Sequence, residues 1–261
     1  MNQLQIESIA AQSPKFTAPI VLIHGLWCRA SMWRPFMGYL AHRGWTCSAP
    51  HLRGHAGAED TVDIREVGLR DYVRDVERVI AASGAPPVVI GHDIGGLLAL
   101  QCAARGTRAV VALAPVVPRS IARTSHPALS GLAARLARLR MRPILPPRGR
   151  VGAAFFAGGP PGGMTPESPV IGSELGEAGF SVSPCSGVPT LVIAGEHDPF
   201  CPPSAVQQLA RSLGAAFLTA EGATHSMPWG FGWEKRVADT HRWLIQSLGE
   251  PLLAWSGDEE E

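Results

Sequence analysis

The sequence lacks the features that mark several large classes of protein. Its 261 residues carry a formal net charge of only +1, so nothing in the charge balance favours nucleic acid or an anionic membrane as a partner. No run reaches the roughly 18 consecutive apolar residues of a membrane span. The stretch from Met1 to Lys15 has no basic start followed by an apolar block, so we expect no secretion signal.

The cysteines do not indicate a disulfide framework. They are odd in number and scattered, which favours free thiols in a reducing cytoplasm. The five are Cys28, Cys47, Cys102, Cys185 and Cys201. His51 and His55 lie close together, but no cysteine or carboxylate stands beside them to complete a metal site. We therefore expect a cytoplasmic protein without a metal ion or other cofactor.

Apolar residues, in contrast, are abundant and regularly placed. They make up 46% of the chain, and the length suits one α/β domain with a large core. Short β-branched runs alternate with helical patterns. Strands are predicted at 19–23, 45–49, 88–90, 109–113, 190–194 and 216–219, and helices from Ser31 to Gly44 and at 69–80, 94–105, 203–213 and 233–248. This alternation predicts a parallel sheet with helices on both faces, whose site lies beyond the carboxyl ends of the strands.

The alternation stops between residues 115 and 187. One helix face of leucines is followed by a segment rich in proline and glycine, from Pro146 to Gly163. Long irregular insertions in compact domains are usually functional. We interpret 115–187 as a lid on a core formed by 1–114 and 188–261, the alternative being ordinary loops with one surface helix. Its apolar residues suggest a hydrophobic small-molecule substrate; they include Leu129, Leu132, Phe155, Phe156 and Phe180.

The stretch from Val88 to Gly96 is the most informative one in the chain. Gly91 and Gly95 stand two residues before and two after Asp93. Such spacing is typical of a sharp turn from a strand to a helix, because side chains at the two glycine positions would collide. The central residue of this turn, Asp93, is then forced into a strained backbone conformation.

Four marks in register resemble the α/β-hydrolase family over nearly the whole chain. They are His24-Gly25 after the first clear strand, the turn at Asp93, the acid Asp198 in Gly195-Glu196-His197-Asp198, and His225 after the last strand. The resemblance implies the family's fold, a mostly parallel sheet between helices with an inserted lid. Two departures are the single candidate strand at the N-terminus and the aspartate that replaces the usual serine. The run Gly-His-Asp-x-Gly-Gly is similar to haloalkane and haloacetate dehalogenases and epoxide hydrolases.

An aspartate at this turn points to attack on saturated carbon. Its attack on an acyl carbon would give a mixed anhydride, whereas displacement of a halide or an epoxide oxygen gives an ordinary ester. The resemblance implies that His225 activates water to hydrolyse this ester and that Asp198 orients His225. The backbone N–H groups of Leu26 and Ile94 would form the oxyanion hole. We slightly favour an epoxide substrate over a carbon–halogen bond.

The usual electrophilic assistants are missing. The lid contains no tyrosine or tryptophan, the chain has only Tyr39 and Tyr72, and Ile94 stands where haloalkane dehalogenases usually have a tryptophan. Candidates to line the pocket or assist the leaving group are Trp27, His92, Met227 and Trp229, with His126 or a lid arginine as a further proton donor.

Two other classes of function stay open. Asp93, alone or with His225, would serve as a general base in a lyase, cyclase or isomerase that tailors a natural product. Alternatively, the chain is a catalytically inactive homologue that binds a ligand. The sequence indicates neither the substrate nor an oligomeric state.

Overall fold

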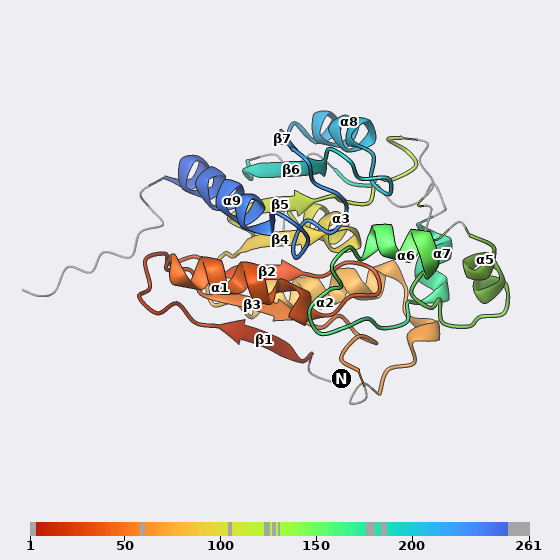
Figure 1. The fold of residues 1–261 in the computed structure, drawn as a ribbon. Coiled ribbons are helices and arrows are strands. Elements are labelled where there is room, and N and C mark those ends of the chain that lie inside the picture. The colour runs from red at the N-terminus through yellow and green to blue at the C-terminus, as the bar shows by residue number, and fades with distance from the viewer. Residues whose placement is uncertain are drawn as a thin grey trace, which may run out of the picture.

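The computed structural model describes residues 4–57, 61–103, 106–122, 126, 129, 131–175, 181–183 and 187–249. They contain one seven-stranded sheet in the order β1-β3-β2-β4-β5-β6-β7 (Figure 1). The strands are β1 (Ile6–Ile9), β2 (Ile20–Ile23), β3 (Cys47–Pro50), β4 (Val88–His92), β5 (Ala109–Leu113), β6 (Thr190–Gly195) and β7 (Ala216–Ala220). Every pair of neighbours is parallel except the edge pair β1–β3. The predicted α/β class with a mostly parallel sheet is confirmed.

Helices cover both faces of the sheet. On one face, α1 (Arg34–His42) contacts α9 (Trp233–Leu248), and on the other α2 (Leu69–Ala81) contacts α3 (Ile94–Gln101) (Figure 1). Helix α8 (Pro203–Leu213) packs against β6 and β7. Two short 3₁₀ helices, η1 (Ala30–Trp33) and η2 (Ile64–Glu66), lie in connections. Across the described ranges, no helix combines the length and apolar character needed to pass through a membrane.

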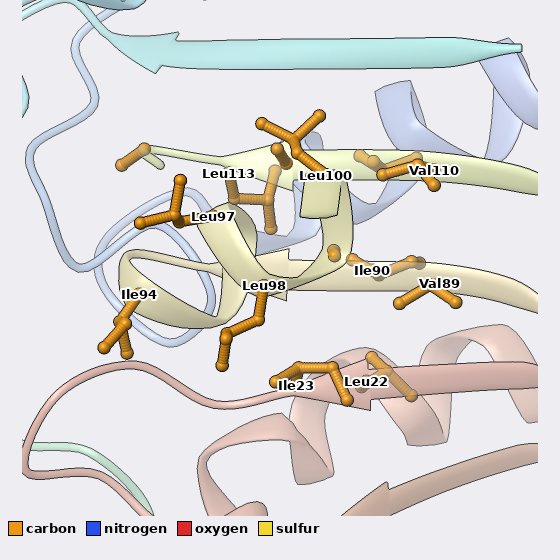
Figure 2. Close-up of a cluster of buried hydrophobic side chains, with 14 of the residues drawn as sticks. Leu22, Ile23, Val89, Ile90, Ile94, Leu97, Leu98, Leu100, Val110 and Leu113 are labelled. Carbon is orange, nitrogen blue, oxygen red and sulfur yellow. The ribbon is translucent and has the colours of Figure 1, made fainter. Parts of the chain in front are cut away.

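The core is built around β4 and the helix that follows it. All five residues of β4 are buried, and α3 is buried from Ile94 to Leu100. Figure 2 shows α3 lying over the sheet, with Leu98 on the side of β2 and Leu100 on the side of β5. A helix that is apolar on every side belongs in the interior. The turn between β4 and α3 is therefore held in place by packing from several directions.

Within the described residues, three helices interrupt the core between β5 and β6. They are α5 (Leu132–Leu139), α6 (Gly149–Phe155) and α7 (Pro169–Glu174), and they gather beyond the ends of β2 and β5 (Figure 1). The leucine pattern predicted α5, but its face is not packed: Leu132 is 73% exposed and Leu139 is 80% exposed. Helices α6 and α7 were not predicted, because glycine and proline obscure their pattern. The segment lies where the sequence places a lid, and its extent and lid role stay predictions.

Several predicted element boundaries were wrong, including those at Ser31, at Trp45 and at the end of α3. Ser31 does not cap a helix; it lies inside η1, and α1 begins at Arg34, with Pro35 in its first turn. The third strand begins at Cys47 rather than Trp45, whose indole ring stacks on Phe16 and donates to His241. Helix α3 ends at Gln101, and the predicted end at 105 lies outside the described residues.

Candidate active site

Asp93 occupies the predicted turn between β4 and α3, and its backbone is strained as expected, with φ 55° and ψ −119°. A Cβ on Gly91 would lie 2.0 Å from the carbonyl oxygen of Gly95. A Cβ on Gly95 would lie 2.2 Å from the carbonyl oxygen of Ile23. No side chain fits at either position, so the two glycines let the chain turn sharply enough to aim Asp93 away from the strand end.

The structure brings Asp93, Asp198 and His225 together. His225 Nδ1 lies 2.9 Å from Asp198 Oδ2, and His225 Nε2 lies 3.9 Å from Asp93 Oδ1. The other oxygen of Asp198 accepts hydrogen bonds from the backbone N–H groups of Phe200 and Cys201. This arrangement fixes the carboxylate that orients His225, and it leaves Nε2 facing Asp93. The catalytic roles of the three residues remain predictions.

The two carboxylate oxygens of Asp93 have different surroundings. The backbone N–H of Leu26 donates to Oδ2 at 2.9 Å. Ile94 is the first residue of α3, where an amide N–H has no intrahelical acceptor. Oδ1 is buried and has no hydrogen-bond partner among the described residues. A Cβ on Gly25 would lie 2.9 Å from Asp93 Cβ, so glycine at this position permits the close approach of the carboxylate to the Leu26 amide.

Charge is concentrated in this buried site. Burial by itself raises the pKa of Asp93, but interaction with His126 and the charges of His225 and His126 outweigh it and bring the pKa to about 2. Burial likewise opposes, but does not prevent, a lowered pKa for Asp198 beside His225. Burial lowers the pKa of His225, but the neighbouring carboxylates of Asp198 and Asp93 raise it by more, so the net shift is upward. Asp93 is therefore ionised at neutral pH, as an unassisted nucleophile must be.

Two further histidines form hydrogen bonds with the backbone of the loops around the site. His92 Nε2 donates to the backbone carbonyl of His225 at 2.8 Å, and burial lowers the pKa of His92 to about 4. His24 accepts from the backbone N–H of Leu52 through Nε2, and its Nδ1 lies 3.0 Å from the Gly25 carbonyl oxygen. These bonds hold the loops that carry Leu26 and His225. The structure thus favours hydrogen-bonded support over substrate contact for His92.

His126 enters the site from the lid. Its Nε2 lies 3.6 Å from Asp93 Oδ1, and only 7% of its side chain is exposed. Its ring packs against those of Phe155 and Phe200, with centroid separations of 5.6 and 5.8 Å. The sequence offered His126 only as one of several donors, because no local pattern connects it with a turn 33 positions earlier.

The indole N–H groups of both predicted tryptophans are bonded to backbone carbonyls, and their roles toward a substrate stay predictions. The indole N–H of Trp27 donates to the backbone carbonyl of Ile144 at 2.9 Å, and that of Trp229 donates to Ala157 at 3.1 Å. Both therefore fasten the lid to the core. Met227 is 3% exposed and lies in the turn after His225, where its N–H bonds to the His225 carbonyl.

Phe155, from the segment between β5 and β6, packs against the site. The ring of Phe155 at the end of α6 lies 4.3 Å from that of His225 and 5.3 Å from that of Trp27, centroid to centroid. Leu129 is also buried, whereas Leu132 is largely exposed to solvent. Phe180 lies outside the described residues. The aromatic ring of Phe155 therefore lies against the imidazole that faces Asp93 Oδ1.

One cysteine that the sequence did not single out joins this cluster. Ligand atoms of Asp93, His126 and Cys201 lie within 4.8 Å of one another, as do those of Asp198, Cys201 and His225. Metal ions bind cysteine as the thiolate. Burial and the charges of Asp198 and Asp93 raise the pKa of the Cys201 thiol well above its ordinary value, so the thiol form is favoured.

Solved structures resemble this fold over most of its length. The monoacylglycerol lipase of Paleococcus ferrophilus is 18% identical, with a TM-score of 0.69, covering 94% of this chain and 99% of its own. The pyrethroid hydrolase PytH, solved with BIF, is 19% identical, with a TM-score of 0.67, covering 89% of this chain and 99% of its own. At these identities the likeness concerns the fold alone.

Sequence comparison finds a relative that matches a shorter part of the chain, and it also identifies the family. The pyrethroid hydrolase of Sphingobium wenxiniae is 31% identical over 77 residues, which are 30% of this chain. The match spans only 27% of that relative's length. The sequence profile described as "Alpha/beta hydrolase family" matches residues 20–239, which include the turn at Asp93, Asp198 and His225. The protein therefore belongs to the alpha/beta hydrolase family.

Proposed function

We propose that the protein is a hydrolase that opens a hydrophobic epoxide through an alkyl ester of Asp93. The inequality of the two Asp93 oxygens carries this proposal. Oδ1 is buried, ionised and free to attack, whereas Oδ2 already lies against the Leu26 N–H. In the second step the oxyanion would form on the Asp93 carboxyl itself. The Leu26 N–H at Oδ2 would then stabilise that negative charge. One such donor lowers the activation free energy by on the order of 3 kcal/mol.

The second half of the reaction belongs to His225. Its Nε2 faces Asp93 Oδ1 at 3.9 Å and has no other partner among the described residues. A water molecule placed beside the ester carbonyl would give a proton to Nε2, and Asp198 at Nδ1 would stabilise the imidazolium that forms. Because the pKa of His225 is raised, this step should accelerate with pH above the ordinary range of histidine.

The similar proteins are named as a lipase and as pyrethroid hydrolases, but the geometry at Asp93 supports cleavage of a different kind of bond. An ester substrate would need Oδ1 to attack its acyl carbon, and the mixed anhydride that results gains nothing over the starting ester. Its carbonyl oxygen would also compete with Oδ2 for the Leu26 N–H. Displacement at saturated carbon meets neither difficulty.

The hydrogen bonds of the two tryptophans favour an epoxide over an alkyl halide as the substrate. A leaving halide needs N–H donors, yet those of Trp27 and Trp229 are bound to lid carbonyls. The residue after the nucleophile is Ile94, which offers no side-chain donor. An epoxide oxygen instead needs one proton, for which the site has imidazole groups.

Trapping the intermediate tests the proposal. In His225→Gln the water-activating base is absent, so the ester on Asp93 should accumulate and raise the intact mass by that of one epoxide molecule. We would expose the variant to styrene oxide, a bromoalkane and chloroacetate, and map any adduct by peptide mass spectrometry. His42→Gln, which removes an exposed histidine on α1, serves as the control and should not accumulate adduct. Absence of an Asp93 adduct with all three probes contradicts the proposal.

One observation favours a second candidate. Two imidazoles flank the ionised Asp93 Oδ1, with Nε2 atoms at 3.6 and 3.9 Å, an arrangement also suited to moving protons in a lyase, cyclase or isomerase. Turnover in ¹⁸O-labelled water separates the two. The ester route places solvent oxygen in Asp93, whereas proton transfer leaves its oxygens unchanged. Tight ligand binding without turnover would instead identify an inactive homologue.

A further inference from the structure

We propose that His126 is the catalytic acid of the first half-reaction, donating the proton that the opening epoxide oxygen needs. This inference rests on the proposed function and deepens it, because it assigns the group that the chain was expected to lack. It also narrows the substrate class to molecules whose leaving group must be protonated as the carbon–oxygen bond breaks.

The position of His126 is that of a reacting group. Its Nε2 and the Nε2 of His225 both face Asp93 Oδ1, while the two rings are 6.3 Å apart between centroids. An epoxide bound at Oδ1 therefore lies next to both imidazoles. Neither ring nitrogen of His126 has a hydrogen-bond partner among the described residues, although both are buried. A buried histidine without partners is costly unless a ligand supplies them.

Competing proton donors near the site are occupied. The Tyr72 hydroxyl bonds to Glu167 and His55, and the indole N–H groups of Trp27 and Trp229 bond to lid carbonyls. Arg138 of the lid, another candidate, donates to backbone carbonyls at positions 129 and 172. The Cys201 thiol is close, but its raised pKa makes it a weak acid. His126, whose ring nitrogens have no hydrogen-bond partner among the described residues and whose Nε2 lies 3.6 Å from Asp93 Oδ1, is the donor that is left available beside the nucleophile.

The proton balance of the cycle closes with these residues. Asp93 Oδ1 forms a bond to the epoxide carbon, the carbon–oxygen bond breaks toward oxygen, and that oxygen takes the proton from His126 Nε2. Water then attacks the ester carbonyl and gives a proton to His225, which passes it to the departing alkoxide oxygen, so that the diol is released. Asp93 is left as a carboxylic acid, and its proton returns to His126 across the 3.6 Å contact. The net reaction is epoxide plus water to diol.

The test follows the first half-reaction alone, in the His225→Gln background, where the adduct is stable. Mass spectrometry after mixing with styrene oxide gives the rate of Asp93 alkylation. Adding His126→Gln should slow it about 100-fold or more, since a positioned acid contributes 10²–10⁴. The rate should also fall with rising pH while His126 is present and lose this dependence in the double variant. A merely structural role would leave the pH profile unchanged.

Three controls make the outcomes decisive. His225→Gln with His42→Gln should alkylate at the rate of His225→Gln alone. Thermal unfolding must show that the double variant is folded, and His126→Asn repeats the test if the glutamine variant is not. Equal alkylation rates with and without His126, or an unchanged pH profile, overturn the inference while leaving the proposed function intact. If His225→Gln itself forms no adduct, the proposed function fails, and this is seen before His126 is changed.

Discussion

The two carboxylate oxygens of Asp93 have different surroundings, which are set by the strained backbone, a nearby glycine and two imidazoles. The positive φ at Asp93 turns the side chain toward the Leu26 amide, and Gly25 leaves room for it. A substitution that displaces the carboxylate by a few tenths of an ångström would therefore affect the reaction without removing any reacting group. This is a residue-scale property that can be tested with a single methyl group.

Gly25→Ala should impair catalysis far more than folding. The new Cβ would lie 2.9 Å from Asp93 Cβ and 3.1 Å from Asp93 Oδ2, so the carboxylate must move away from the Leu26 N–H. Loss of one oxyanion donor corresponds to on the order of 100-fold in the hydrolysis of the Asp93 ester. The measurement is the decay of the adduct after a single turnover.

Gly38→Ala is the matched control for this change. Gly38 lies on α1, and a Cβ there meets nothing within 4 Å. Alanine in a helix is more favourable than glycine by roughly 0.5–1 kcal/mol, so this variant should be slightly more stable and fully active. Equal ester decay in the two variants would refute the role given to the Leu26 contact.

At the scale of elements, the lid is joined to the core by buried polar groups. His55 bonds to Thr165 and Tyr72, and the Tyr72 hydroxyl on α2 also bonds to Glu167, at 2.8 Å. The tryptophan bonds to Ile144 and Ala157 add two more connections. Residues of the lid therefore depend on α2 and on the loop after β2 for their position.

Tyr72→Phe should loosen this attachment. It leaves His55 and Glu167 each short of one partner in a buried setting, which costs about 1–3 kcal/mol. We expect a lower free energy of unfolding and faster hydrogen exchange in residues 165–174. Tyr39→Phe on α1, half-buried and away from the lid, should change neither quantity. Similar behaviour of the two variants would show that the lid is held by apolar packing instead.

At the scale of the whole molecule, buried neutral histidines make stability depend on pH. Burial lowers the pKa of His92 to about 4 and that of His24 well below 6.5. In the unfolded chain both take up protons near pH 6.5, so the unfolded state binds more protons below that pH. Stability should therefore fall between pH 6.5 and 4, by about 3 kcal/mol for His92 alone at 1.36 kcal/mol per pKa unit.

Urea unfolding across this range measures the effect. His225 acts in the opposite sense, because its raised pKa gives stability at low pH that is lost as pH rises through the folded value. The lowered pKa of Asp93 matters only in a more acidic window, between 3.8 and about 2. A free energy of unfolding that stays constant from pH 6.5 to 4 would contradict neutral burial of His24 and His92.

The sequence predicted the core and the turn better than the lid, for a physical reason. Gly91, Asp93 and Gly95 are close in sequence, so steric rules alone place the turn. The apolar runs likewise define the sheet. The bond from Trp27 to Ile144, in contrast, joins residues 117 positions apart. No local pattern encodes such a contact, so the use of that indole N–H, the exposure of Leu132 and the approach of His126 to Asp93 came only from the structure.

The Leu26–Asp93 contact has a consequence for inhibition. Trifluoromethyl ketones and phosphonates disable serine hydrolases by placing a negatively charged oxygen against backbone amides. In this protein a carboxylate oxygen of the enzyme itself already lies at that amide, so such reagents meet an occupied position and a repelling charge. Under the proposed mechanism the enzyme contributes the acyl half of its intermediate and the substrate only the alkyl half. Compounds that resemble the carbon skeleton of the substrate, rather than its carbonyl, are the ones that this site should retain.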